Sequence, residues 1–226
     1  MKMNMVPDAS AQPDRDARIA RSQALHDLAE QHFRALAPFL SPVRVQDHAR
    51  RLARLRPDVW TGSDDQTAFV IELAAWTADK GRSTALERYA RQTALPAGSD
   101  DARVLTGLQA SIISFWTVHE VHPVAGWLLR DLANEGTLWV VDASLGQYLD
   151  RGGSPCFLAR LFRADSGGFW MTCATLFAAP EALANFGLGR EGEGDAVQTG
   201  SERHIALSRQ SAYVAFLYAP LLSKGG

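Results

Sequence analysis

The chain has 226 residues, of which 46% are hydrophobic, and its 23 basic residues nearly balance its 25 acidic ones to give a net charge of −2. This composition fits one large globular domain or two small ones and excludes a disordered chain. The charge balance excludes a global attraction to nucleic acid or to an anionic membrane, so any such attraction has to be local. No apolar run approaches the roughly 20 residues of a spanning helix, and the start lacks the apolar stretch of a signal peptide. We therefore expect a cytoplasmic protein with no membrane contact.

The first half of the chain is predicted to be helical. Residues 1–13 are expected to form a disordered tail, and apolar residues then recur at helical spacing up to Pro38. Two pairs with capping-box spacing, Ser63 with Gln66 and Thr84 with Glu87, indicate further helix starts. Residues 14–110 are thus expected to form a helical bundle. The five predicted helices begin near Asp14, Ser41, Asp64, Thr84 and Ser99, and the third is expected to cover about residues 64–80.

From Ser111 onward, β-branched and aromatic residues separated by short turns indicate strands. Several short strands close together favour a small antiparallel sheet that curls or closes, of the SH3-like or OB-like kind, because closure removes exposed edges. We therefore predict an α+β fold: an N-terminal helical bundle, a small five-stranded antiparallel β-barrel-like module over residues 111–179, and a Gly-rich loop with a C-terminal helix over residues 180–226 that packs back on the chain. The strands are expected at residues 112–121, 126–132, 137–142, 156–163 and 168–177.

Two histidines, His119 and His122, lie at the end of the first predicted strand. A zincin helix needs His-Glu-x-x-His, and this chain is one residue short of that spacing. On a strand the two side chains point to opposite faces, about 10 Å apart along the chain. We expect one histidine to be packed and the other exposed, and we predict no metal site.

Four tryptophans and several arginines are interleaved in the predicted β module. Exposed rings beside arginines are typical of single-stranded nucleic-acid binding, whereas buried rings would fill the core of a small barrel. Both interpretations stay open, and they differ in whether at least two rings are exposed on one face. The candidate residues are Trp116, Trp127, Arg130, Trp139, Arg160, Arg163 and Trp170.

The second predicted helix carries a basic stripe opposite its apolar face. Such a stripe is either a solvated surface or a contact for phosphate or an acidic partner, and salt dependence of binding would separate the two. The candidate residues are Arg44, Arg50, Arg51 and Arg54.

Motifs for catalysis or cofactor binding do not occur in the sequence. There is no P-loop, no dinucleotide fingerprint and no nucleophile elbow. Cys156 and Cys173 lie in apolar strand-like segments and are expected to be buried thiols. We predict no cofactor and name no catalytic residue, and the alternative is an enzyme whose site combines His119 or His122 with distant residues such as Cys173.

Residues 65–178 resemble the β module, with preceding helices, of a loosely described group of bacterial proteins, many of which end in a SEC-C zinc motif. The resemblance implies a helical segment joined to a compact β module and implies no activity. The cysteine-rich tail of that group is missing here, so a role tied to its zinc site does not carry over. The matching residues are Glu120-Val121, Leu129-Arg130-Asp131-Leu132, Gly136, Val140-Val141 and Ala159-Arg160-Leu161, with Trp76, Asp79, Gly81 and Thr84-Ala85-Leu86-Glu87 upstream.

The sequence therefore favours a non-catalytic binding or adaptor protein. Its expected partner is a protein or nucleic acid, bound through the β module and the basic helix. A structural subunit of a larger complex is a further alternative, which an exposed apolar patch on the last helix would favour.

Overall fold

The computed structural model describes residues 12–178 except Arg56, 58–59, 79–80, 133–135 and 165–166. The predicted tail up to Ala11, and the predicted Gly-rich loop and C-terminal helix, lie outside the described residues. The tail was predicted to extend to residue 13, but Gln12 and Pro13 belong to the first helix instead. The described part has an α+β fold, as predicted. Its helices are α1 (Gln12–Leu36), the 3-10 helix η1 (Ala37–Phe39), α2 (Pro42–Leu55), α3 (Asp64–Trp76), α4 (Ala85–Gln92), α5 (Asp100–Gln109) and α6 (Ala143–Asp150), and its strands are β1 (Ile112–Val121), β2 (Trp127–Asp131), β3 (Thr137–Val140), β4 (Cys156–Phe162) and β5 (Met171–Ala178).

Side-chain caps fix the starts of three helices where the sequence places them. The hydroxyl groups of Ser63, Thr84 and Ser99 each accept a hydrogen bond from a backbone N–H in the first turn of the following helix. Helix α3 is shorter than predicted: it ends at Trp76, because Thr77 adopts an extended conformation there. The Thr77 hydroxyl donates to the carbonyl of Leu73 at 2.6 Å. This bond satisfies a carbonyl of the last helical turn.

The five strands form one antiparallel sheet in the order β3-β2-β1-β4-β5. The sheet curls far enough for its two edges to meet at one end, where Val140 and Trp170 form a parallel bridge. There the backbone N–H of Trp170 donates to the Trp139 carbonyl at 2.8 Å, and the N–H of Val141 donates to the Trp170 carbonyl at 3.0 Å. The predicted small, curled antiparallel sheet is thus confirmed, with strand ends that differ by up to three residues.

Helix α6 corrects the prediction, which placed a loop between the third and fourth strands. Its N-cap is Asp142, whose side chain accepts hydrogen bonds from the N–H groups of Ser144 and Leu145 at 2.7 and 3.0 Å. The second carboxylate oxygen of Asp142 accepts from the N–H and hydroxyl of Thr172. This buried residue therefore starts α6 and also joins it to β5.

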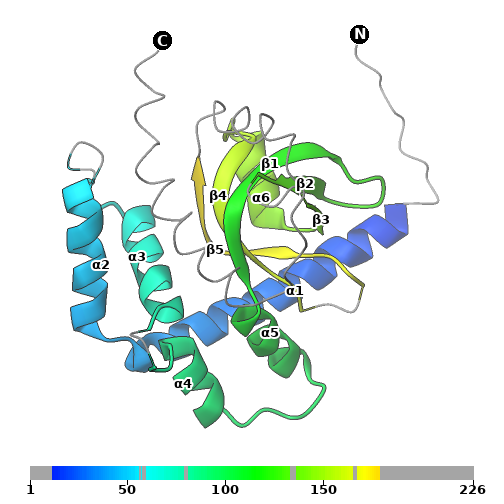
Figure 1. Ribbon diagram of the computed structural model, residues 1–226. Coiled ribbons are helices and arrows are strands. Elements are labelled where there is room, and N and C mark those ends of the chain that lie inside the picture. Colours follow the sequence, from blue (N-terminus) through cyan, green and yellow to red (C-terminus); the bar gives the residue numbers. More distant parts are fainter. Residues whose placement is uncertain are drawn as a thin grey trace, which may run out of the picture.

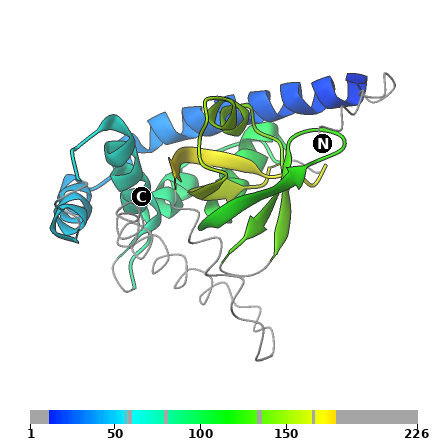
Figure 2. The same ribbon diagram turned by 90° about the horizontal axis from the view of Figure 1, so that it is seen from above.

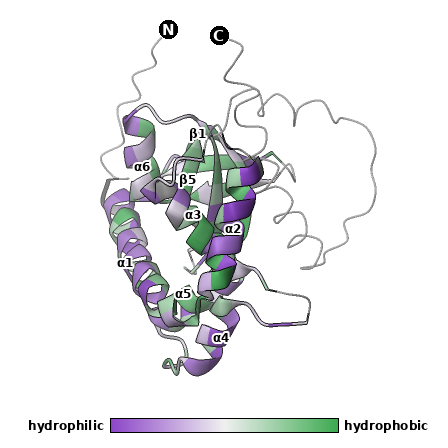
Figure 3. Ribbon diagram, turned by 90° about the vertical axis from the view of Figure 1, so that its left-hand side faces the viewer, coloured by the Kyte–Doolittle hydropathy of each residue, from purple (hydrophilic) through white to green (hydrophobic). Residues whose placement is uncertain are grey.

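The helices and the sheet share hydrophobic cores. Helix α1 runs along the sheet, while α2 and α3 lie at one end of the molecule (Figures 1 and 2). One cluster joins apolar residues of α1, α4 and α5 to Phe162 and Met171 of the sheet, and another joins α2 and α3 to Ile113 and Leu158. These two clusters cross the expected boundary at residue 110, whereas a third, around Trp116, Leu129 and Phe157, lies wholly within residues 112–176. The surface of α2 alternates between hydrophilic and hydrophobic residues (Figure 3).

A buried ion pair fastens α3 to the sheet. Arg160 Nε of β4 donates to Glu72 Oε1 of α3 at 2.8 Å, and both side chains are almost fully buried. The guanidinium of Arg160 also lies over the ring of Trp76, 4.4 Å from its centroid. Moving α3 away from the sheet would leave each buried charge without its partner, which is costly, so the pair fixes where α3 docks.

Across the residues that the structure describes, each helix is either too short or too polar to cross a membrane.

Candidate functional site

A basic cleft of about 900 Å³ lies between α2 and the segment that joins α3 to α4. Helix α2 contributes one wall, and the other includes residues 77–78, residues 81–83 and Arg88. A cavity of this size falls in the range of small-molecule sites in proteins. We call it the basic cleft because, among the described residues that line it, the charged ones are the cations Arg44, Arg51, Arg82 and Arg88 and a single carboxylate, Asp47.

The amphipathic sequence of α2 explains how its arginines reach this cleft. Leu52 is fully buried, and Val45 and Ala49 pack against the same cluster, so this face of the helix docks on α3. Arg44 and Arg51 are seven residues apart, which places both on one side of the helix. That side borders the docked face, and the two guanidinium groups therefore line the cleft rather than point straight into solvent.

The opposite wall is shaped by two turns and by Arg88. Gly81 has φ +77°, a left-handed conformation that glycine adopts without strain, and Thr84 then caps α4. Arg88 donates to the carbonyl of Ser83 and to that of Phe39, both at 2.7 Å. Arg88 thus ties the wall to the end of η1 while its charge stays at the cleft.

His48 forms the neutral floor of the cleft. Its Nε2 lies 2.9 Å from the Thr77 hydroxyl, which already donates its only proton to Leu73. The imidazole therefore has to donate, so Nε2 carries the hydrogen. Burial lowers the pKa of His48 to about 4, helped by the charges of Arg51 and Arg44 and opposed by Asp47. At neutral pH His48 thus adds no positive charge to the arginines of the described lining.

Arg51 and Arg82 are two cleft arginines whose charge is available to a ligand. In the described part of the chain, no carboxylate lies within ion-pair distance of Arg51 or Arg82, and both side chains are exposed. Asp47 is shared with Arg50, whose Nη1 is 3.5 Å from its carboxylate. The described lining of the cleft therefore has an excess of positive charge, which favours an anion.

The structure separates the four predicted α2 arginines into two groups. Arg44 and Arg51 line the cleft, whereas Arg50 and Arg54 extend the same positive surface outside it and are exposed. Sequence reasoning missed Arg82 and Arg88 because they come from a different segment and belong to no motif. Only the docking of α2 on α3 brings the two segments together.

The β-module tryptophans belong mainly to the interior. Trp116 is fully buried, and its indole N–H donates to the Ala159 carbonyl at 2.9 Å. Trp127 and Trp170 are half-buried and pack against the same core cluster. Trp139 packs against a different cluster, with its N–H donating to the Ala125 carbonyl at 2.7 Å. None of these four rings is exposed, so the core interpretation describes them better than a stacking surface.

The arginines predicted beside these rings also have separate environments. Arg160 is buried in its ion pair with Glu72, so neither it nor Trp116 can reach a surface ligand in this conformation. Arg130 is half-buried on β2, opposite Thr117 of β1. Arg163 is exposed, and its guanidinium lies 5.7 Å from the ring centroid of Trp170. Arg163 and Trp170 both line a cavity.

The two histidines of the first strand separate as predicted. His119 is exposed at a bulge in β1, and His122 is half-buried and stacks on Trp139 with ring centroids 4.1 Å apart. Burial and the charge of Arg18 lower the pKa of His122. The described residues contain no cluster of three or more side chains able to hold a metal ion. Cys173 is buried, and neither the basic cleft nor the cavity beside Trp170 includes it or either histidine.

No protein-family model, curated protein or solved structure matches this chain.

Proposed function

We propose that the protein is a non-catalytic binding or adaptor protein that holds the phosphate backbone of a nucleic acid in the basic cleft. One observation carries the proposal: arginines from two separate segments converge on one cavity, and the described residues that line it include a single carboxylate. Guanidinium groups pair with phosphate in fixed, often bidentate geometry, which makes arginine the preferred cation for such contacts.

The extent of the positive surface favours a polymer over a small anion. Arg50 and Arg54 lie outside the cavity but on the same helix, beside the cleft arginines. A free phosphate or a nucleotide would fit inside the cleft without contacting them. A continuous backbone, in contrast, would contact both groups of arginines in succession.

The mode of binding that we expect follows from the side chains at the cleft. In the described part of the chain no exposed tryptophan lies beside the cleft, so bases have no tryptophan ring to stack on there. Phosphate contacts fix position without reading sequence. We therefore expect weak sequence preference and strong dependence on salt. The expected cytoplasmic location would provide access to RNA and DNA.

Fluorescence anisotropy with labelled single-stranded RNA, single-stranded DNA and duplex DNA tests this proposal. Replacing Arg51 and Arg82 by Gln should reduce affinity at least tenfold at low salt and lower the salt slope by about two, one for each lost phosphate contact. Arg151→Gln is the matched control, because Arg151 is exposed and lies beyond the end of α6, outside the cleft.

Competition identifies the class of ligand. Unlabelled nucleic acid should displace the probe, whereas inorganic phosphate and polyglutamate should do so only at far higher concentrations. Equal competition by polyglutamate would identify an acidic protein partner instead. Binding that ignores the Arg51 and Arg82 changes, or no binding at low salt, would overturn the proposal.

A further inference from the structure

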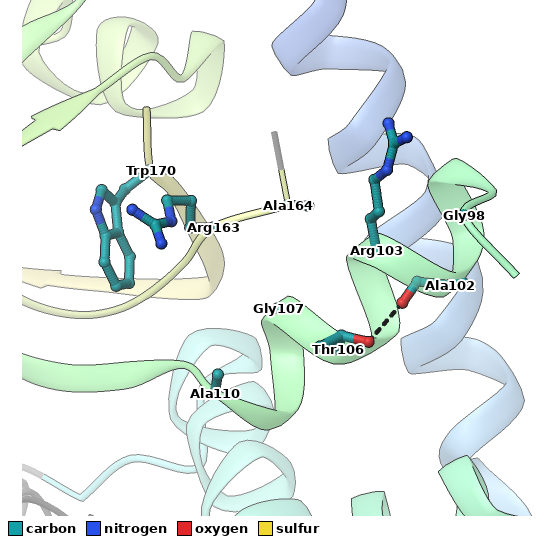
Figure 4. A pocket seen from close by; sticks show the side chains of 9 residues that line it. All are labelled: Gly98, Ala102, Arg103, Thr106, Gly107, Ala110, Arg163, Ala164 and Trp170. Atoms are coloured by element: carbon teal, nitrogen blue, oxygen red, sulfur yellow. Dashed lines mark hydrogen bonds between the residues drawn. The ribbon is translucent and has the colours of Figure 1, made fainter. Parts of the chain in front are cut away.

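A second cavity, of about 530 Å³, is lined in the described part of the chain mainly by α5, by Arg163 and Ala164 after β4, and by Trp170 before β5 (Figure 4). Its floor consists of small residues on one face of α5, Ala102, Gly107 and Ala110, together with Ala164. The opposite face of α5 is buried in the core through Val104, Leu105 and Leu108. The cavity therefore exists because the outward face of a well-anchored helix carries short side chains.

Close backbone packing keeps this floor in place. A Cβ atom on Gly107 would lie 2.4 Å from the carbonyl oxygen of Arg163, so α5 contacts the end of β4 almost directly. The floor is held by backbone contact and not by long side chains. We infer that the cavity is a fixed feature of the fold, which reduces the entropy that a ligand loses on binding.

Two cations border this apolar floor at opposite ends (Figure 4). Arg163 lies against the ring of Trp170 at one end, and no carboxylate of the described residues pairs with it. Arg103 stands at the other end, 3.3 Å from Asp100. Asp100 is also bound by Arg21 through both of its oxygens, so one carboxylate serves two guanidinium groups. The described lining of the cavity contains no acidic residue.

We propose that this cavity binds a small, flat aromatic carboxylate. The ligand's ring would cover the apolar floor and pack against the Arg163 guanidinium and the Trp170 indole. Its carboxylate would bind a guanidinium at the rim. The volume is in the range of small-molecule sites. Flat π-systems stack well on arginine and tryptophan, and carboxylates form charge-assisted hydrogen bonds with guanidinium groups. This site is independent of the basic cleft.

Isothermal titration of the full chain with indole-3-carboxylate tests the inference. Indole lacks the charge, and cyclohexanecarboxylate lacks the aromatic ring. We expect both to bind at least about tenfold more weakly than the probe, because a charge-assisted hydrogen bond corresponds to that factor or more. Equal binding of either analogue, or no heat from the probe up to about 5 mM, would overturn the proposal.

Variants then locate the site. Ala102→Leu should abolish binding by placing a branched side chain on the floor where the ring would lie, and Arg163→Met should weaken it about tenfold while keeping a side chain of similar length. Arg151→Met, distant and exposed, should leave binding unchanged. Because Arg163 is exposed, Arg163→Met remains informative even where Ala102→Leu disturbs folding. Undiminished binding by Arg163→Met would exclude the site, as would binding by folded Ala102→Leu.

Discussion

The buried pair of Glu72 and Arg160 provides the sharpest test of how this fold is held together. The two charges are 2.8 Å apart, with side chains 1% and 6% exposed. Replacing Glu72 by Met leaves the Arg160 cation buried without its partner, which typically costs about 3 to 5 kcal/mol of stability. For a chain of this size that corresponds to a fall in melting temperature on the order of 10 °C.

The double variant distinguishes pairing from burial alone. Glu72→Met with Arg160→Met replaces the pair by apolar side chains that can still contact Trp76, and such replacements are often nearly neutral. We therefore expect the double variant to be more stable than either single variant. Urea unfolding, followed by circular dichroism, measures all four free energies of unfolding, and their cycle gives the coupling.

An exposed pair provides the control for this cycle. Glu30 and Arg34 are 2.6 Å apart on α1, but both are largely exposed. Glu30→Met should therefore cost no more than about 0.5 kcal/mol. If the costs of Glu72→Met and Arg160→Met simply added in the double variant, the two charges would not be coupled, and the reasoning would fail.

Three further predictions concern stability, measured as urea midpoints. His48 has a pKa of about 4 in the folded protein, so as pH falls below 6.5 the unfolded state binds a proton before the folded state does. Stability should therefore drop by a few kcal/mol between pH 6.5 and 4. An equally steep drop in the His48→Phe variant would contradict this. Asp142→Ala removes the acceptor of four hydrogen bonds and should cost about 2 to 4 kcal/mol, whereas the same change at exposed Asp150 should cost under about 0.5. Gly126 and Gly98 both have positive φ, but only at Gly126 would a Cβ meet backbone, at 2.0 Å; Gly126→Ala should therefore cost at least about 2 kcal/mol more than Gly98→Ala, and equal costs would refute the argument.

Local signals made much of the fold predictable. Ser63, Thr84 and Ser99 mark helix starts through short-range hydrogen bonds that the sequence itself specifies. Alternating and β-branched residues located all five strands to within three residues. Asp142 is also a cap, but its short helix α6 has a weak apolar period, and the glycines around it indicate a loop.

The candidate sites were less predictable because they depend on tertiary packing. The stripe on α2 predicted Arg44 and Arg51, but the partners Arg82 and Arg88 follow from how α3 docks. Similarly, no periodicity shows that Arg160 is inside and Arg163 outside, since they lie three residues apart across the end of β4. Alternation predicts opposite faces along a strand, and it says nothing about residues beyond the strand's end.

The parallel bridge between Val140 and Trp170 has a consequence for folding. The bridge joins β3 to the residue that precedes β5, and these two strands are adjacent neither in the chain nor in the sheet order. Each hairpin can therefore form before this seam between the two sheet edges closes. The amide protons of Val141 and Trp170 should therefore exchange with solvent earlier than those of central β1. An open seam would present two bare strand edges, which are templates for self-association. The two hydrogen bonds thus cover both strand edges at this end of the sheet.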